Sequence, residues 1–589
     1  MNSQNLSRSI FRNSETILIY PATWIVLGLL FIAKMIFIFW TINMGFDITD
    51  EGNYMLVYKF PDSDPYPFHE YQTVLAPVMK WFGHSIIAGR VLRILLECGG
   101  LTILWFGWMR YFSSAGAEGR VSLADKAVAF FFLASGTFLS LFPRTISYND
   151  FTNFGMLATA AILFTILSPA KKIPTWALAG TGFVFAFLFF IKFPPAILFF
   201  LVVTFCIGFS SNRWKNFTAF FAGIISGTIA FFLIQGDPMS WPDRFVKGKE
   251  IVSLLGYDAE RLVREIYIPD LFELSIKILP AVAVFLAASF AIRRNGDEQK
   301  HAWIPFAGAI AFFAILCAID NRNGFESLTY AYRHSGSIYS GTVFLLLALM
   351  ILVLFLFRLM DRRKSINLLA AALTLLPFLG MAGTDTSFSV SIYAYVLPEF
   401  AVILFLLQRN FIRPFPLNIL IVAMGLFANS LFYYHSAFHP YRLAEPLSEQ
   451  TETCPQLPGI LIDQSSSKFI EDVWTQLKLG GFKSGDPVIA LSDMPGVVFA
   501  VGASSPGAPW YFELPHSDAY NCHHLRNVAG QTAGERPFIL IDSAATPAVL
   551  QCLESAGIGY PGEYTLQWKG FNPWRKVPVQ LQVPSVVNQ

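Results

Sequence analysis

An acidic pair, Asp50-Glu51, directly follows the first long apolar segment of the chain, within Phe46-Asp-Ile-Thr-Asp-Glu-Gly-Asn-Tyr54. Carboxylates are costly to hold near lipid, so a pair at the rim of a membrane span indicates a functional site that faces water. An acceptor hydroxyl becomes a good nucleophile when a carboxylate removes its proton. We therefore expect Asp50 to act as a general base in a membrane-embedded enzyme.

A second candidate carboxylate, Asp150, ends the segment Arg144-Thr-Ile-Ser-Tyr-Asn-Asp150 between two apolar segments. We expect Glu51 and Asp150 to join Asp50 at one site and to shape the binding of the acceptor or of a cation. Converging carboxylates make a divalent metal ion an option, although a Lys or Arg on a substrate phosphate would remove the need for it. A helix N-cap before Phe151 explains Asp150 equally well, and the two roles can coexist.

Basic residues in the loops on the same side are candidates for binding the donor phosphate that the family resemblance described below implies. Arg333, beside His334, is preferred because a guanidinium offers two parallel donors and stabilises the charge of a departing phosphate. Lys192 is the second candidate, since it lies on the side of the membrane where basic residues are scarce. Lys80 is better explained as a side chain that reaches the membrane interface. Weaker candidates are Arg244, Lys247 and Lys249.

Four further residues are expected to line the pocket for the acceptor or the sugar: Tyr54, His69, Glu70 and Asp385. His69 and Glu70 also fit the start of a short helix on the membrane surface, and this structural role is slightly favoured. Asp385 lies in Gly383-Thr-Asp-Thr386, where a turn with an Asx cap explains it nearly as well.

The composition requires a membrane as the main solvent. Hydrophobic residues make up 54% of the chain and charged residues only 14%, with a mean hydropathy of +0.50, which is outside the usual range of a soluble domain. A net charge of +2 gives no sign of a nucleic-acid partner. Apolar runs predict about thirteen transmembrane helices. The first runs from Tyr20 to Trp40 and is too long for a signal peptide; the others centre near Leu101, Phe132, Thr159, Val184, Val202, Gly227, Val284, Ala311, Leu347, Leu375, Phe400 and Gly425.

Charge predicts the orientation of these spans. With the N-terminus in the cytoplasm, every second loop is basic, as the positive-inside rule requires. The acidic loops then face outward, and an odd number of spans places the C-terminal tail outside as well. We expect a multi-pass protein of the plasma membrane, the inner membrane of a bacterium. Glu97 lies inside the second span and needs a partner, for which Arg93, one turn away, is the candidate.

The composition changes near Tyr441, which predicts a membrane domain over residues 1–440 and an extracytoplasmic domain over residues 441–589. Apolar runs at Pro487–Leu491 and Pro537–Asp542 predict buried strands. Amphipathic patterns over Ser467–Leu479 and Thr546–Ala556 predict helices, so the tail is expected to be a small α/β domain. Gly496 is expected in a loop.

Three cysteines of the tail, Cys454, Cys522 and Cys552, allow one disulfide and leave one thiol, and the sequence does not choose the pair. The cluster Cys522-His523-His524 is expected to be a surface loop, because no second pair of ligands has the spacing of a metal site.

Taken together, the pattern resembles the GT-C superfamily of polytopic glycosyltransferases, which includes protein O-mannosyltransferases and lipid A aminoarabinose transferases. The matching features are Asp50-Glu51-x-x-Tyr54, an Asp in the second outward loop, many spans and an outward C-terminal domain. The resemblance implies a polyprenyl-phosphate sugar donor, transfer to a glycan, lipid or protein acceptor on the extracytoplasmic face, and inversion at the anomeric carbon. Similar transferases often carry a basic residue within the acidic motif. Here Gly52-Asn53 stand at that place, so the phosphate must be bound from elsewhere.

Two alternatives share this topology. An oligosaccharide ligase that uses a whole lipid-linked glycan would need a long outward loop with basic residues, and residues 235–270 could provide it. A lipid or sugar transporter without catalysis would be expected to show charges at mid-membrane depth and a repeat with broken helices. The clearest charges here lie at the outward rim, so an enzyme is favoured.

Overall fold

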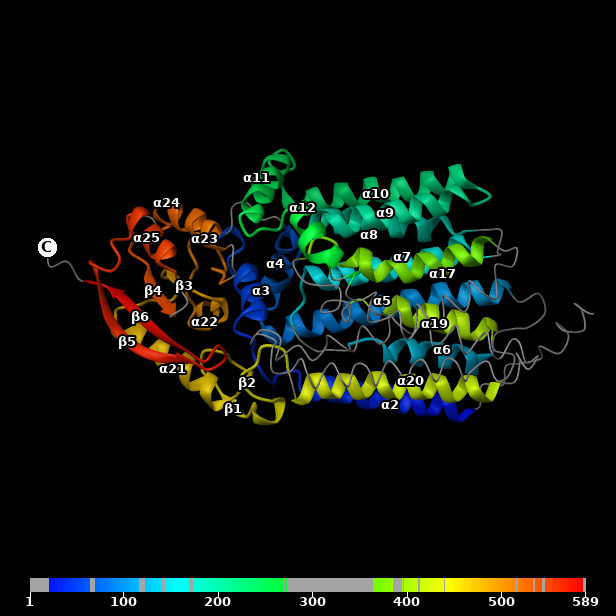
Figure 1. Ribbon diagram of the computed structural model, residues 1–589, viewed down its shortest axis with the longest axis horizontal. Coiled ribbons are helices and arrows are strands. Elements are labelled where there is room, and N and C mark those ends of the chain that lie inside the picture. Colours follow the sequence, from blue (N-terminus) through cyan, green and yellow to red (C-terminus); the bar gives the residue numbers. More distant parts are fainter. Residues whose placement is uncertain are drawn as a thin grey trace, which may run out of the picture.

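The structure is a computed structural model. It consists of a helical part followed by a C-terminal region with a mixed β-sheet (Figure 1). The described residues are 21–63, 69–115, 122–138, 144–168, 173–269, 271–272, 364–384, 395, 397–410, 414–438, 440–513, 517–532, 535–542 and 546–585.

The helices of the first part are α2 (Pro21–Trp40), α3 (Asp50–Lys59), α4 (Tyr71–Trp81), α5 (Ile86–Ala115), α6 (Leu123–Ser135), α7 (Tyr148–Ile166), α8 (Thr175–Ile191), α9 (Phe193–Gly208), α10 (Arg213–Gln235), α11 (Trp241–Ser253), α12 (Ala259–Arg261), α17 (Lys364–Gly380), α19 (Leu397–Asn410) and α20 (Pro414–Tyr433). The predicted span centres at Val284, Ala311 and Leu347 lie outside the described residues. Every other predicted centre falls within one of these helices.

Two helical segments of the described residues, Ala22–Trp40 and Arg213–Gln235, are long and apolar enough to cross a membrane. Three shorter apolar helices accompany them, at Thr175–Ile191, Phe193–Gly208 and Leu368–Gly380. Length and composition alone are weak evidence, because a buried core helix passes the same test. The thirteen spans therefore stay a prediction.

The long helices run side by side (Figure 1), and small residues bring α8 and α10 into backbone contact. A Cβ atom on Gly223 of α10 would lie 1.9 Å from the carbonyl oxygen of Ala179 in α8. Small residues at helix contacts are typical of membrane bundles, where close packing replaces the hydrophobic effect as the driving force. The largest apolar cluster joins these helices to α5, α6, α17 and α19 through side chains such as Trp108, Phe132 and Phe400.

The C-terminal region contains a four-stranded sheet in the order β3-β4-β6-β5. Its strands are β3 (Val488–Leu491), β4 (Phe538–Asp542), β5 (Tyr564–Asn572) and β6 (Val577–Pro584). Strands β3 and β4 are parallel and fully buried, while β6 is antiparallel to both β4 and β5. A short pair, β1 (Glu452–Thr453) and β2 (Leu461–Ile462), precedes this sheet. The two predicted strands are confirmed as β3 and β4.

The helices of the C-terminal region are α21 (Gln464–Leu479), α22 (Pro495–Ala500), α23 (Ser517–Arg526), α24 (Val528–Gln531) and α25 (Pro547–Ser555). The two predicted helices are confirmed as α21 and α25. Two loop predictions were wrong, because Gly496 lies in α22 and Cys522-His523-His524 lies in α23. A disulfide between Cys522 and Cys552 joins α23 to α25, and Cys454 is a buried free thiol.

The loop that carries the acidic pair is docked on the C-terminal region, and α3 and α4 lie between the long helices and the sheet (Figure 1). Backbone hydrogen bonds join Leu461 to Asn43 and Gly45, each 2.7 Å long, and the N–H of Gly496 donates to Ile48 O over 2.7 Å. Apolar side chains of α3 and α4 share one core with α21, α22 and the sheet. The C-terminal region therefore holds the helix on which the candidate base stands.

Candidate active site

Helix α3 begins with a capping network around Asp47. One carboxylate oxygen of Asp47 accepts from the N–H and the hydroxyl of Thr49, at 2.8 and 2.7 Å, and the other accepts from the N–H groups of Asp50 and Glu51, at 3.1 and 3.3 Å. Burial and the nearby charge of Asp50 raise the pKa of Asp47 to about 7. Asp47, which stands in the acidic motif with Asp50 and Glu51, thus accepts hydrogen bonds from the first N–H groups of α3.

Glu51 is fully buried and forms an ion pair with Arg90 of α5. Its two oxygens accept from Nε and Nη2 of Arg90, at 2.8 and 2.7 Å, and one of them also accepts from the hydroxyl of Thr145 at 2.8 Å. Burial opposes ionisation of Glu51, but the charge and hydrogen bonds of Arg90 outweigh it and lower the pKa of this carboxyl. Arg90 also donates to the carbonyl oxygens of Ile42 and Gly45. Glu51 thus ties α3 to α5.

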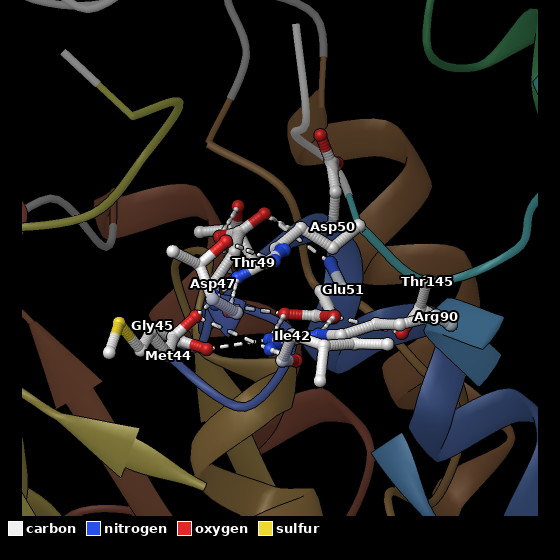
Figure 2. Close-up of polar contacts among 11 residues, drawn as sticks. Ile42, Met44, Gly45, Asp47, Thr49, Asp50, Glu51, Arg90 and Thr145 are labelled. Atoms are coloured by element: carbon white, nitrogen blue, oxygen red, sulfur yellow. Dashed lines mark hydrogen bonds and ion pairs between the residues drawn. The ribbon is translucent and has the colours of Figure 1, made fainter. Parts of the chain in front are cut away.

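Asp50 differs from its neighbour in both direction and exposure. Figure 2 shows its side chain directed away from the Glu51–Arg90 pair, and 17% of that side chain is exposed, against none for Glu51. Its Oδ2 accepts from the hydroxyl of Tyr441 at 2.9 Å, and its Oδ1 lies 3.1 Å from Nη1 of Arg442. No sequence signal pointed to these partners, because they come from the far end of the chain.

Asp150 belongs to the cap of α7. The N–H and the hydroxyl of Ser147 donate to its Oδ2, at 2.7 and 2.8 Å, and Nε of Arg93 donates to its Oδ1 at 2.8 Å. The helix begins at Tyr148, so Ser147 is the N-cap and Asp150 is the third residue of a capping box. The expectation that Asp150 itself is the N-cap was therefore wrong, although it does close the cap. Its side chain is almost completely buried.

Glu97 of α5 meets a partner that the sequence did not suggest. Both of its oxygens accept from Nδ2 of Asn153, at 2.9 and 2.8 Å. Arg93, the expected partner of Glu97, uses its Nε for Asp150. These contacts join α5 to α7.

Lys192 lies in the one-residue connection between α8 and α9 and is buried. Its Nζ donates to Oδ1 of Asn149 at 3.2 Å and lies 5.2 Å from the ring centroid of Tyr148. The hydroxyl of Tyr395 donates to the same oxygen of Asn149 at 3.1 Å. Burial lowers the pKa of Lys192 to about 7. Tyr148, Asn149 and Tyr395 were not among the predicted site residues.

An aromatic wall runs from Lys192 to Tyr54 of α3, the helix that begins at Asp50. The His69 ring stacks on Tyr148 with centroids 4.6 Å apart, and its Nδ1 lies 3.0 Å from Ile191 O, so Nδ1 carries the proton. Burial and the charge of Lys192 lower the pKa of His69 to about 3. The Tyr54 ring meets Tyr148 edge-on at 6.2 Å. Burial, followed by the charges of Tyr148 and Asp50, raises the pKa of Tyr54, so Asp50 lies within electrostatic reach of this wall.

Glu70 stands at the N-cap position of α4, but its side chain makes no capping hydrogen bond to the helix backbone. It accepts from the hydroxyl of Thr73 at 2.6 Å, and it forms an ion pair with Nη2 of Arg244 at 3.1 Å. Lys247 pairs with Asp243 on an exposed face of α11, and Lys80 is exposed. Because Arg244 already pairs with Glu70, Lys192 is the better candidate to bind a phosphate.

Several predictions lie beyond what the structure describes: Arg333, His334 and Asp385 fall outside the described residues. Among the described residues, no group of three or more His, Cys, Asp or Glu side chains is arranged to hold a metal ion.

No family model and no curated protein matches the sequence. A crystal structure of ArnT from Cupriavidus metallidurans in the apo state is similar over 94% of this chain and 97% of that one, with 11% identity and a TM-score of 0.38. At this identity and TM-score no functional argument rests on it, and function is argued from the site.

Proposed function

We propose that this chain is a membrane glycosyltransferase of the GT-C type that moves a sugar from a polyprenyl-phosphate donor to an acceptor hydroxyl on the extracytoplasmic face, with inversion. The observation that carries the proposal is the chemistry at the two ends of the Tyr148 wall. Asp50 is a partly exposed carboxylate near one end, and Lys192 is a buried cation at the other. Inversion requires that the acceptor attacks one face of the sugar while the phosphate leaves from the other. A base and a phosphate-binding cation on either side of a ring-lined surface suit this arrangement.

The reaction balances with these residues alone. The acceptor hydroxyl gives its proton to the carboxylate of Asp50 as its oxygen forms the new bond to the anomeric carbon. The bond from that carbon to the phosphate oxygen breaks, and the oxygen keeps the electron pair. Lys192, when protonated, stabilises the charge on the departing polyprenyl phosphate. Tyr54, Tyr148 and His69 offer ring faces and edges to the sugar between them.

Of the three candidate carboxylates that the structure describes, Asp50 is the most exposed: 17% of its side chain, against 8% for Asp150 and none for Glu51. Glu51 is buried in its ion pair with Arg90, and Asp150 is almost completely buried in the cap of α7, where Arg93 also pairs with it. We therefore assign these two carboxylates to holding α3, α5 and α7 in place around the base. Arg333, His334 and Asp385 stay candidates for the donor and sugar contacts.

The test is transfer by purified protein in liposomes that contain a polyprenyl-phosphate sugar. Asp50→Asn should lower kcat by about 100-fold to 10,000-fold, the usual contribution of a general base. Asp472→Asn, which removes a partly exposed carboxylate of α21, should keep wild-type turnover. Near wild-type turnover by Asp50→Asn in folded protein would sink the proposal.

A further inference from the structure

Arg442 reaches the candidate base from the C-terminal region. Its Nη1 donates to the hydroxyl of Thr49 at 2.9 Å and lies 3.1 Å from Oδ1 of Asp50. The side chain of Arg442 is 29% exposed and thus stands at the edge of the protein interior, beside the partly exposed carboxylate of Asp50. One cation therefore contacts both the first residue of α3 and the residue that precedes it.

The guanidinium of Arg442 is held among aromatic rings. Its Cζ lies 4.9 Å from the ring centroid of Tyr441, 5.9 Å from that of Trp510 and 5.7 Å from that of Trp574. Contacts of this length attract a cation through the negative faces of the rings. Since the rings come from three separate segments of the C-terminal region, the folded region sets the place of the guanidinium.

Acidic and basic side chains hold one ring of this cage, Trp510, in place. Nε1 of Trp510 donates to one oxygen of Asp493 at 3.1 Å, and Nη1 of Arg575 donates to the other at 3.2 Å. Arg575 also pairs with Glu513. Rotation of the Trp510 indole away from Arg442 would break the hydrogen bond from Trp510 to Asp493. This bond therefore holds the ring where it contacts the guanidinium.

The backbone around the cage adopts an uncommon conformation. Arg442, Ser492, Asp493 and Lys576 have positive φ angles of 54°, 79°, 54° and 58°. They are four of the six non-glycine residues with positive φ in the described part of the chain. Such angles are unfavourable for residues with a Cβ and collect where a site requires them.

We propose that the C-terminal region completes the active site by supplying Arg442 as a positioning residue for Asp50. Arg442 fixes Oδ1, so that Oδ2 points where a hydroxyl can meet it. Tyr441 already donates its hydroxyl to Oδ2, which is the contact that an acceptor hydroxyl must make before it loses its proton. The acceptor replaces Tyr441 at this oxygen. The inference rests on the proposed function, since it concerns the same base.

The experiment compares Arg442→Gln and Arg442→Lys with Arg526→Gln, which removes an exposed arginine of α23. Arg442→Gln should lower kcat by about 100-fold, the effect of misplacing a reacting group by an ångström, with the donor KM changed less than about twofold. Arg442→Lys should keep part of the rate, and guanidinium ion added at millimolar concentration should raise the rate of Arg442→Gln but not that of the wild type. Arg526→Gln should match the wild type.

Trp510→Leu gives a second route to the same conclusion, because it keeps the cation and opens the cage. It should lower kcat by about tenfold and should not respond to guanidinium ion. The proposal is overturned if Arg442→Gln keeps wild-type kcat, or if its loss of rate comes with a fall in melting temperature and no rescue. If Asp50→Asn is inactive while Arg442→Gln is normal, the inference fails and the proposed function stands. If wild-type protein transfers no sugar, both fail.

Discussion

Gly52 of α3 and Gly496 of α22 meet at backbone contact: a Cβ atom on Gly52 would lie 2.2 Å from the Cα of Gly496. A Cβ on Gly496 would in turn lie 2.5 Å from the Cα of Ile48, in the segment just before α3. No side chain fits between the two helices. Gly52 directly follows the acidic pair, so its lack of a side chain lets the helix of the candidate base dock on the C-terminal region.

Gly52→Ala should therefore weaken both stability and turnover. The added methyl group meets backbone, which does not yield as a flexible side chain would, and overpacking of this kind costs about 1–3 kcal/mol. Thermal unfolding in detergent measures the stability, and sugar transfer in liposomes measures the activity. Gly530→Ala in α24 is the matched control, because nothing lies within 4 Å of the added methyl group there. A melting temperature of Gly52→Ala equal to that of this control would contradict the close packing.

Glu51→Gln should destabilise the protein more than Asp50→Asn does. Glu51 is buried in a salt bridge with Arg90, and removing one partner of a buried pair leaves an uncompensated charge, at a cost of about 3–5 kcal/mol. Asp50 is partly exposed, so water can replace what its amide variant loses. The comparison is made by thermal unfolding of both variants at neutral pH. Equal melting temperatures would show that the Glu51–Arg90 pair does not hold α3 to α5.

The same pair predicts a response to acid. The pKa of Glu51 is lower in the folded protein than its ordinary value, so the unfolded chain takes up a proton first as the pH falls. The stabilisation by Glu51 is then fully present above the ordinary pKa of a glutamate, about 4.3, and is lost as the pH falls through the lower folded value. Melting temperature measured between neutral pH and pH 3 should show this loss. Glu51→Gln should lack that part of the acid dependence.

The contrast between local and distant partners explains which parts of this protein could be predicted. Strands β3 and β4 and helices α21 and α25 follow from runs and periods within a few residues. The cap of α7 was also within reach, because Ser147 and Asp150 have the spacing of a capping box. The N-cap role that the sequence offers as one option for Asp150 places the start of the helix at the apolar run from Phe151. The helix begins earlier, at Tyr148.

The partners of Asp50 could not be predicted in this way. Tyr441 and Arg442 lie 391 and 393 positions from the residues they bind, and no pattern within one segment connects such positions. The acidic pair also shows the limit of a motif. Asp50 and Glu51 are adjacent and chemically alike, yet one is buried against Arg90 and the other faces water, because successive helix residues point about 100° apart. Only the packing of α3 decides which carboxylate is accessible.

Lys192→Gln should weaken binding of the donor and should remove the pH dependence of the donor KM. Burial lowers the pKa of Lys192 to about 7, so the free enzyme loses this cation as the pH rises through that value. We expect the donor KM to increase above about pH 7 in the wild type, and a bound phosphate to hold the proton on Lys192 through its opposite charge. The loss of a charged hydrogen bond, about 1.5–3 kcal/mol, corresponds to a KM that is roughly 10-fold to 150-fold higher.

The control for Lys192→Gln is Lys483→Gln, which removes an exposed lysine of the C-terminal region. Initial rates at several donor concentrations between pH 6 and pH 9 give KM for all three proteins. The control should follow the wild-type curve. A variant at Lys192 with the wild-type KM and the wild-type pH profile would exclude Lys192 from the donor site.

The side of the membrane on which the C-terminal region lies can be tested without any knowledge of the substrate. Leu461 exchanges backbone hydrogen bonds with Asn43 and Gly45, directly after α2 ends, so the C-terminal region must lie on the side where α2 emerges, whatever the number of later spans. Since the basic loops predict a cytoplasmic start for α2, an alkaline phosphatase fused after Gln589 should be active, because this enzyme needs an oxidising compartment for its disulfides. The same reporter inserted at Lys171-Lys172 should be inactive. The opposite pattern would reverse the orientation and would remove the extracytoplasmic donor from the proposed reaction, while leaving the contacts of Asp50 unchanged.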